Sequence, residues 1–252
     1  MFEIYQDSLF FLFPICSLTV GMGAFLLFAL PYSWLSWKNP TRFIPYRIQK
    51  RRMSAEEVFW PSLMRLAINA VCSLILAVVL WPLLRLSGVH AGGLPHWYEV
   101  LWQLPFFLIV DDLGFYFLHR MLHTRWLYKH VHAVHHRFTA PWAIAGGYMH
   151  PVEYMLITLL ALIGPLLVGP HVVTIWIWAI FRQWEAAEGH CGYEFPWNPT
   201  RWLPGYEGPA FHDFHHKRFV GNYANYFGLL DRWLGTESPS YRDYRRDSQA
   251  AG

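Results

Sequence analysis

Long runs of residues without charge constrain the fold of this chain more than any other feature. The first run, residues 9–30, contains no charged side chain and is long enough to span a bilayer. A second run covers residues 66–84, and a third covers about 98–118. Only 15% of the residues are charged, whereas soluble domains carry about 25%. We therefore expect an integral membrane protein whose apolar runs are transmembrane helices.

The charges between these runs predict how the helices are oriented. Glu3 and Asp7 precede the first run, so it lacks the basic start of a cleavable signal peptide and is interpreted as a retained span. Six Lys and Arg residues follow within 38–52, whereas the loop 87–96 has none. Basic residues also follow the third run, at Arg120, Arg125, Lys129 and Arg137. The positive-inside rule then places the loop 38–52 and the segment after residue 118 in the cytosol.

The apolar run over residues 154–181 is long for one helix and is interrupted by Gly164-Pro165 and Gly169-Pro170. Gly and Pro together are typical of turns. A single crossing would put the last histidines of the chain on the opposite side of the membrane from the earlier ones. A hairpin of two helices would keep them all on the cytosolic side. We expect the hairpin, because a shared metal centre requires it.

The predicted fold is therefore all-α, with about four transmembrane helices and a cytosolic helical cap rich in histidine. We expect one membrane domain over residues 1–252, with the cap formed by 119–150 and 182–236 and a loose polar tail over 237–252. The formal net charge of +3 is too small to indicate a nucleic-acid partner. The three cysteines are odd in number and far apart, which predicts free thiols.

Histidine is the outstanding excess in the composition, with fourteen residues in the chain. Eight of them form three boxes, HxxxH, HxxHH and HxxHH: His119, His123, His132, His135, His136, His212, His215 and His216. In a helix, spacings of three and four residues place side chains on one face. Eight imidazoles exceed the four ligands of a tetrahedral zinc. The boxes therefore predict two metal ions held close together, with the three boxes as their ligands.

The other histidines divide into two kinds. His150 and His190 lie where the predicted hairpin enters and leaves the membrane, and we expect both to complete the metal ligands. His130 is out of phase with its neighbours, and it is set aside. His90, His96 and His171 lie in or near predicted turns and are expected to be packed or surface residues.

Several carboxylates lie close to the boxes. Asp112 shares a helical stripe with His119 and His123, so it could orient a ligand imidazole through its far nitrogen. The alternative is that Asp111 and Asp112 are solvated near the helix end. Asp213, Glu185 and Glu188 leave the same two interpretations open.

The position of the boxes favours a class of function. Imidazole binds zinc, copper, iron and nickel alike, so the boxes alone do not choose the metal. In a transporter, ionisable residues tend to lie near the bilayer midplane, whereas all three boxes lie at cytosolic ends. An open metal site under an apolar membrane cavity indicates redox chemistry on a lipid. The alternative from another class is a membrane metal-binding or transport protein without catalysis.

Around the boxes, the stretches HRMLH, YKHVHAVHHRFTAP, HPVEY, RQWEAAEGHCGYEFPW, FHDFHHKRFVGNYANYF and LLDRWLGT extend the pattern. Together they resemble the fatty acid hydroxylase and sterol desaturase superfamily of membrane di-iron oxidases. The segment from about Asp111 to Thr236, half of the chain, is most similar to C-4 sterol methyl oxidases, or methylsterol monooxygenases. The family pattern falls on the eight box histidines, and His190 corresponds to the histidine before the Gly-Tyr pair.

This resemblance implies two Fe ions, O2 as oxidant, and electrons from NAD(P)H through cytochrome b5 and its reductase. It implies stepwise oxidation of a sterol C-4 methyl group to a carboxylic acid in sterol biosynthesis, with decarboxylation by a partner sterol dehydrogenase. It also implies residence in the endoplasmic reticulum membrane.

Two positions depart from the family pattern. Phe211 stands where many relatives have His or Tyr, and Cys191 stands where they have Ser. A fatty acid hydroxylase and a sterol C-5 desaturase remain alternatives within the superfamily, and iron and zinc both stay open for a purified preparation.

Overall fold

The computed structural model describes residues 2–250, and their regular elements are helices with no strand among them. Four helical segments are long and apolar enough to cross a membrane. They are Ser8–Lys38, which contains α1 (Ser8–Phe10), a π-helical turn (Phe11–Ile15) and α2 (Cys16–Lys38), then α3 (Ala55–Leu84), α4 (Trp97–Leu122) and α6 (Pro151–Val168). The protein is therefore an all-α, multi-pass membrane protein, as the apolar runs predict.

The expected hairpin is present and consists of α6 and α7 (Val172–Gly189). Between them, Gly169 ends α6 in the left-handed conformation with φ of 61°. A Cβ at Gly169 would lie only 2.9 Å from the carbonyl carbon of Gly88, so the turn needs glycine for space as well as for φ. His171 then caps α7 by accepting a hydrogen bond from the Val173 amide. The sequence predicts a turn at each Gly-Pro pair, but Gly164-Pro165 lies inside α6 and only Gly169-Pro170 ends a helix.

The membrane helices are longer than the uncharged runs that predict them. The helix α3 begins at Ala55 because Ser54 and Glu57 form a reciprocal capping box at its start. The helix α4 continues through His119 to Leu122. Charge ends an apolar run but does not end a helix, since backbone hydrogen bonds continue where the chain leaves lipid. The first histidine box therefore extends the third membrane helix.

The packing of the helices depends on small residues at close approaches. At Gly164 of α6, a Cβ would lie 2.9 Å from the ring of Phe107 and 3.1 Å from its Cα. At Gly114 of α4, a Cβ would overlap the side chain of Leu160. Small residues let membrane helices approach closely. The backbones of α4 and α6 therefore lie close together, while α7 packs mainly along α2.

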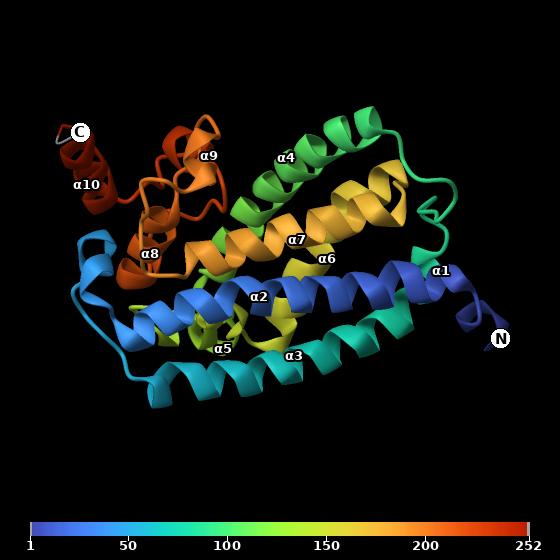
Figure 1. The fold of residues 1–252 in the computed structure, drawn as a ribbon, viewed down its shortest axis with the longest axis horizontal. Helices are drawn as coiled ribbons and strands as arrows, with labels where there is room; N and C mark the ends of the chain where they lie inside the picture. Colours follow the sequence, from blue (N-terminus) through green and yellow to red (C-terminus); the bar gives the residue numbers. More distant parts are fainter. Residues whose placement is uncertain (1, 251–252) are drawn as a thin grey trace.

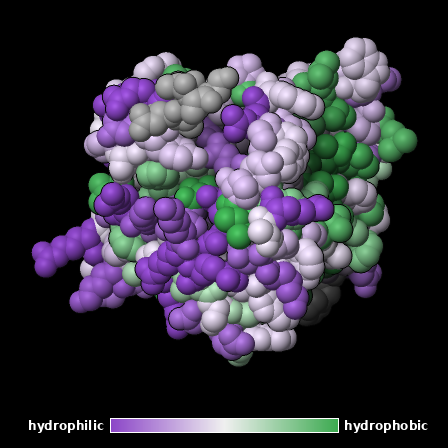
Figure 2. Space-filling model, turned by 60° about the vertical axis from the view of Figure 1, so that its left-hand side comes forward, coloured by the Kyte–Doolittle hydropathy of each residue, from purple (hydrophilic) through white to green (hydrophobic). Residues whose placement is uncertain are grey.

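Short helices form a cap at one end of the membrane helices, opposite the N-terminus (Figure 1). They are α5 (Arg125–His130), α8 (Pro209–Arg218), α9 (Leu229–Trp233), α10 (Pro239–Ala250) and the 3-10 turns His132–Arg137, Ala143–Gly147 and Pro199–Trp202. The basic loop after α2, with the 3-10 turn Thr41–Tyr46, lies at the same end. Figure 2 shows hydrophilic side chains gathered on this end and hydrophobic ones beyond it.

The C-terminal tail differs from the expected loose segment. Residues Pro239–Ala250 form α10, and its Tyr241 is buried, with 3% of its surface exposed. The Tyr241 ring lies 5.1 Å from the ring of Phe211 and 5.6 Å from that of Phe214, both on α8. The tail is polar on average, but these aromatic contacts give it one apolar face, and that face orders it as a helix.

Candidate metal centre

Nine of the ten predicted histidine ligands converge in the cap and divide into two groups. In each group, one nitrogen from every member lies within 4.8 Å of the corresponding nitrogens of the others. The five-histidine group is His119, His123, His132, His136 and His215, and the four-histidine group is His135, His190, His212 and His216. The two groups are neighbours, because the rings of His136 and His216 lie 4.8 Å apart.

Four separate elements supply these side chains. The last turn of α4 and its C-cap supply His119 and His123, and the C-cap of α7 supplies His190. The second box lies on a 3-10 turn, not an α-helix, and the third box lies on α8. The spacing predicts one face for each box, but the structure divides the second and third boxes between the two groups. The five-histidine group is therefore complete only after α4, α8 and the 3-10 turn have packed together, and the four-histidine group only after α7, α8 and the 3-10 turn have done so.

Contacts of the outer ring nitrogens determine the tautomers of several imidazoles. The Nδ1 atoms lie close to backbone carbonyl oxygens in four cases: His119 to Tyr223 at 2.9 Å, His215 to Gly221 at 2.7 Å, His190 to Ala186 at 2.8 Å and His135 to Tyr148 at 3.3 Å. A carbonyl oxygen only accepts hydrogen bonds, so Nδ1 carries the proton in these rings. The inward Nε2 atom then presents a lone pair, which is the form that binds a metal.

The inward nitrogens of each group lie close together. The Nε2 atoms of His190 and His212 are 3.0 Å apart, as are those of His132 and His136, and those of His135 and His190 are 3.3 Å apart. Two nitrogens bound to one metal at roughly 2.0–2.1 Å lie roughly 2.9–3.4 Å apart for angles of roughly 90–109°. The observed separations fit metal coordination. For His135 and His190, whose Nδ1 atoms both donate to carbonyl oxygens, the two inward nitrogens present facing lone pairs and cannot hydrogen-bond to each other.

Burial keeps these imidazoles neutral. Desolvation lowers the pKa of His190 to about 4, and desolvation together with the nearby His119 lowers the pKa of His123 to about 3. For His135 and His216, burial is again the main cause, and neighbouring imidazoles lower the pKa further. A neutral imidazole does not have to lose a proton before it binds a metal, so burial leaves these side chains in the form that could hold a cation.

The tenth predicted ligand, His150, does not belong to either group. It is the N-cap of α6, and its Nδ1 accepts a hydrogen bond from the Val152 amide at 3.2 Å. The structure therefore places His150 outside the two groups that the sequence predicts it to complete. Its position at the start of the hairpin is as expected, but capping the exposed amides of the helix uses the imidazole.

Asp112 also differs from its predicted role. It is buried, with 6% of its surface exposed, so it is not solvated. Its Oδ1 accepts hydrogen bonds from the backbone amides of Tyr226 at 2.8 Å and Phe227 at 3.3 Å. Asp112 therefore holds the segment after α8 against α4 and contacts no imidazole. Asp112 and His119 both lie on α4, as predicted. The His119 Nδ1, however, donates its hydrogen bond to the Tyr223 carbonyl and not to Asp112.

The remaining carboxylates and histidines that the sequence singles out lie outside both groups. Glu185 accepts a hydrogen bond from Asn225, and Glu188 accepts one from Thr200 at 2.9 Å, so neither orients an imidazole. Asp213 is buried, and burial raises its pKa to about 7. The histidines that were set aside or expected outside the centre, His90, His96, His130 and His171, lie outside both groups.

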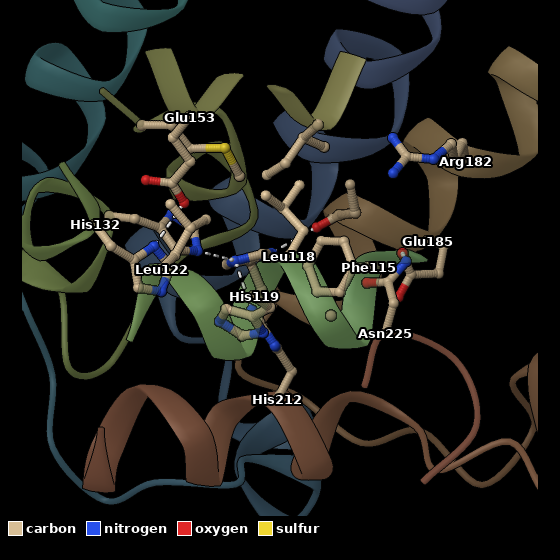
Figure 3. Close-up of a pocket in the computed structure, with 16 residues that line it drawn as sticks. Phe115, Leu118, His119, Leu122, His132, Glu153, Arg182, Glu185, His212 and Asn225 are labelled. Atoms are coloured by element: carbon tan, nitrogen blue, oxygen red, sulfur yellow. Dashed lines mark hydrogen bonds and ion pairs between the residues drawn. The ribbon is translucent and has the colours of Figure 1, made fainter. Parts of the chain in front are cut away.

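Sequence reasoning missed the carboxylate that does contact a ligand. Glu153 lies in the first turn of α6, is 1% exposed, and places Oε1 2.7 Å from the Nδ1 of His132. Figure 3 shows it directed toward that ring. A signal was available in the sequence, because Glu153 is an acidic residue at the start of an apolar run with no basic residue within it. Such intramembrane acids usually have a functional partner.

A small cavity of about 50 Å³ opens on the membrane side of both groups. Its walls include His119, His132, His135, His190 and His212 together with Phe115, Leu118, Leu122 and Ile157 (Figure 3). The apolar side chains come from α4 and α6, so the centre faces the interior of the membrane helices. Polar side chains from α6, α7 and the segment after α8 share this wall, namely Glu153, Arg182, Glu185 and Asn225.

Comparison with known proteins agrees with this centre. The model of the Fatty acid hydroxylase family matches residues 104–236. This chain belongs to the fatty acid hydroxylase family. The matched residues contain every member of the two histidine groups. Members of the family are oxidoreductases that depend on non-haem iron.

Relatives of this fatty acid hydroxylase carry two different names. A very-long-chain aldehyde decarbonylase of Oryza sativa subsp. indica is 39% identical over 213 residues, covering 81% of this chain and 76% of the relative. Methylsterol monooxygenase 2-1 of Arabidopsis thaliana is 36% identical over 233 residues, covering 85% and 84%. Methylsterol monooxygenase 2-2 of the same plant is 41% identical over 170 residues, covering 66% and 62%. No solved structure matches.

Proposed function

We propose that this protein is a di-iron C-4 methylsterol monooxygenase of sterol biosynthesis. The observation that supports it best is the division of nine imidazoles, all but one of them fully buried, into two adjacent groups beside an apolar cavity. Two groups of nitrogen ligands suit two metal ions. Similarity to methylsterol monooxygenase 2-1 along 85% of the chain supports a 4-methylsterol as the substrate.

Iron bound by these imidazoles supplies the capacity to activate O2 and break an unactivated C–H bond. In the first round, one C–H bond of the methyl group breaks and one oxygen atom of O2 forms the hydroxyl. The other oxygen atom leaves as water, using two electrons from NAD(P)H, delivered through cytochrome b5 and its reductase, and two protons. Two further rounds, each consuming another O2, two electrons and two protons, give the aldehyde and then the carboxylic acid, which a partner sterol dehydrogenase decarboxylates.

The residues of the chain contribute position and exclusion of water. Glu153 and the four backbone carbonyls hold the imidazoles in the tautomers that direct Nε2 inward. Phe115, Leu118 and Leu122 line the cavity in front of the metal groups and keep bulk water from the reacting carbon. We place the centre at the cytosolic face of the endoplasmic reticulum membrane, where the basic loops lie and cytochrome b5 can approach.

A second candidate is oxidation or cleavage of a very-long-chain aldehyde. It is favoured by the aldehyde decarbonylase of Oryza sativa subsp. indica, which is 39% identical along 81% of the chain. The metal groups suit either substrate. The two candidates differ in the product that each substrate yields.

The test uses purified, iron-loaded protein in lipid nanodiscs with cytochrome b5, its reductase and NADPH. We expect a 4,4-dimethylsterol to be converted to a 4-carboxysterol and a very-long-chain aldehyde to remain unchanged. His135→Ala and His216→Ala should lose at least about 100-fold in turnover because each removes a ligand. His130→Ala, an exposed histidine outside both groups, is the matched control and should keep full turnover.

Other outcomes would replace the proposal. Consumption of the aldehyde with no sterol product would establish the second candidate. A hydroxylated fatty acid or a C-5 desaturated sterol would place the protein with other lipid oxidases. Bound zinc from a metal-balanced medium with no NAD(P)H-dependent O2 uptake would indicate a membrane metal-binding protein without catalysis.

A further inference from the structure

A second and much larger cavity, of about 610 Å³, lies between α2, α3, α6 and α7. Sites for small molecules typically have volumes of about 300–1,000 Å³ and mostly apolar walls. This wall is mostly apolar, with Leu26, Leu76 and Leu162 among its residues. The cavity at the metal centre, at about 50 Å³, has room only for a reacting group. The body of a lipid substrate therefore needs the larger space.

The two cavities meet at Arg182 of α7, which lines both. The same relation appears along α6, where Glu153 and Ile157 line the small cavity and Tyr154 and Thr158 line the large one. The cavities therefore lie side by side at one level of the hairpin, with the Arg182 guanidinium at their junction.

The guanidinium of Arg182 uses only its Nε donor in hydrogen bonds within the described residues. Its Nε donates to the Oδ2 of Asp111 at 2.9 Å, and the hydroxyl of Tyr226 donates to the same oxygen at 3.0 Å. Among the residues that the structure describes, the two Nη groups make no hydrogen bond, although the side chain is only 11% exposed. Figure 3 shows them directed from α7 toward the interior of the pocket. A buried cation with unused donors in a membrane protein marks a functional site.

The charges around Arg182 select the kind of oxygen that it can bind. Asp111 neutralises the guanidinium, and Glu185 adds a second carboxyl group to the wall of the small cavity. A third carboxylate, such as that of a free fatty acid, would add like charge to a desolvated site. A neutral acceptor oxygen, by contrast, satisfies the Nη donors at no cost in charge.

We propose that Arg182 is a specificity-determining residue that donates hydrogen bonds to a neutral oxygen of the lipid substrate. The apolar body of the lipid occupies the 610 Å³ cavity, and the carbon at or beside the oxygen faces the small cavity and the metal centre. The identity of that carbon rests on the proposed function. In a 4-methylsterol the oxygen is the C-3 hydroxyl, adjacent to C-4, and in a long-chain aldehyde it is the carbonyl.

Binding without turnover tests this proposal. The probes are a 4-methylsterol and its 3-deoxy analogue, and a long-chain aldehyde and the alkane of equal length. Each is measured with the full-length protein in nanodiscs without a reductant. For at least one pair, we expect the oxygen to strengthen binding by about ten-fold to a hundred-fold, as for a hydrogen bond to a charged group. Arg182→Met should reduce that preference below about two-fold, whereas Arg125→Met, an exposed arginine in the cap, should keep it.

Two further variants separate binding from folding. Arg182→Met combined with Asp111→Asn removes both charges, so it does not leave an unpaired carboxylate and should show the same lost preference. Ala77→Trp fills the large cavity and should weaken binding of both members of a pair, whereas Val79→Trp, on the exposed side of α3, should not.

The proposal is overturned if the preference survives in the double variant. It is equally overturned if neither pair is distinguished by the unaltered protein, or if a fatty acid carboxylate binds more tightly than the sterol and the aldehyde. Turnover is scored separately with the reducing system. A retained oxygen preference without any 4-carboxysterol would reject the proposed function and keep this assignment of Arg182.

Discussion

At the level of single residues, the contacts of the outer ring nitrogens decide what the histidines can do. Four Nδ1 atoms face backbone carbonyls, and that of His132 faces Glu153. These contacts explain why the orientation of each imidazole ring could not be predicted from the sequence, although the boxes themselves could be. A carbonyl is present at every residue, so only the fold selects which carbonyl meets which imidazole.

Glu153 should affect the affinity for the metal through His132. Replacing it with Ala removes the acceptor at 2.7 Å from the His132 Nδ1, and loss of such a partner typically costs about 10- to 100-fold in metal affinity. Glu153→Gln keeps an acceptor oxygen and should lose less. Iron content after titration with a competing chelator measures the difference. Equal affinities for the Ala variant and the unaltered protein would show that the contact is not used.

Removal of the metal should destabilise the folded protein. Without a cation, the facing lone pairs of His135 and His190, whose Nε2 atoms are 3.3 Å apart, repel each other. A metal present at about 100 times its dissociation constant adds about 2.7 kcal/mol, which is about 5–10 °C in Tm for a chain of this size. Thermal unfolding in detergent with and without a chelator measures this, and His130→Ala should show the same shift as the unaltered protein. An unchanged Tm in the chelator would contradict metal binding by the two groups.

At the level of elements, the segment between α8 and α9 is tied to α4 by Asp112. Asp112→Ala leaves the buried amides of Tyr226 and Phe227 without an acceptor, which should cost about 1–3 kcal/mol of stability. Asp112→Asn retains the acceptor oxygen and should be close to neutral. Thermal unfolding of the two variants measures this loss of stability. If Asp112 instead oriented an imidazole, Asp112→Ala would lower the metal affinity and leave the Tm unchanged.

The contact between α4 and α6 offers a second test at this level. Gly164→Leu introduces a side chain where even a Cβ would lie 2.9 Å from Phe107. The helices must then separate, and overpacking of this kind costs about 1–3 kcal/mol or more. Because α4 carries His119 and α6 carries Glu153, iron content should fall together with Tm. Gly23→Leu, at a glycine of α2 with open space around its Cβ position, should leave both unchanged.

At the level of the whole molecule, the positions of the loops predict a membrane topology. The loop with Lys50 lies at the end of the cap, and the loop with Gly93 lies at the opposite end of the membrane helices (Figure 1). In sealed microsomes, an impermeant maleimide should label Lys50→Cys at once and Gly93→Cys only after the membrane is opened. The chain without an added cysteine gives the background. The reverse pattern would place the metal centre on the lumenal side.

The sequence by itself determined the class of the fold, the hairpin and nine of the histidines that converge in the cap, because lipid permits few backbone structures and clustered imidazoles have few uses. Only the tertiary structure decided how those histidines divide. Membership in a group depends on which ring faces which across α4, α7 and α8, and no spacing along one helix encodes that. The same holds for Asp112, His150 and Glu153. In the folded chain Asp112 accepts from the Tyr226 amide, His150 accepts from the Val152 amide, and Glu153 contacts His132. These partners give the three residues different roles.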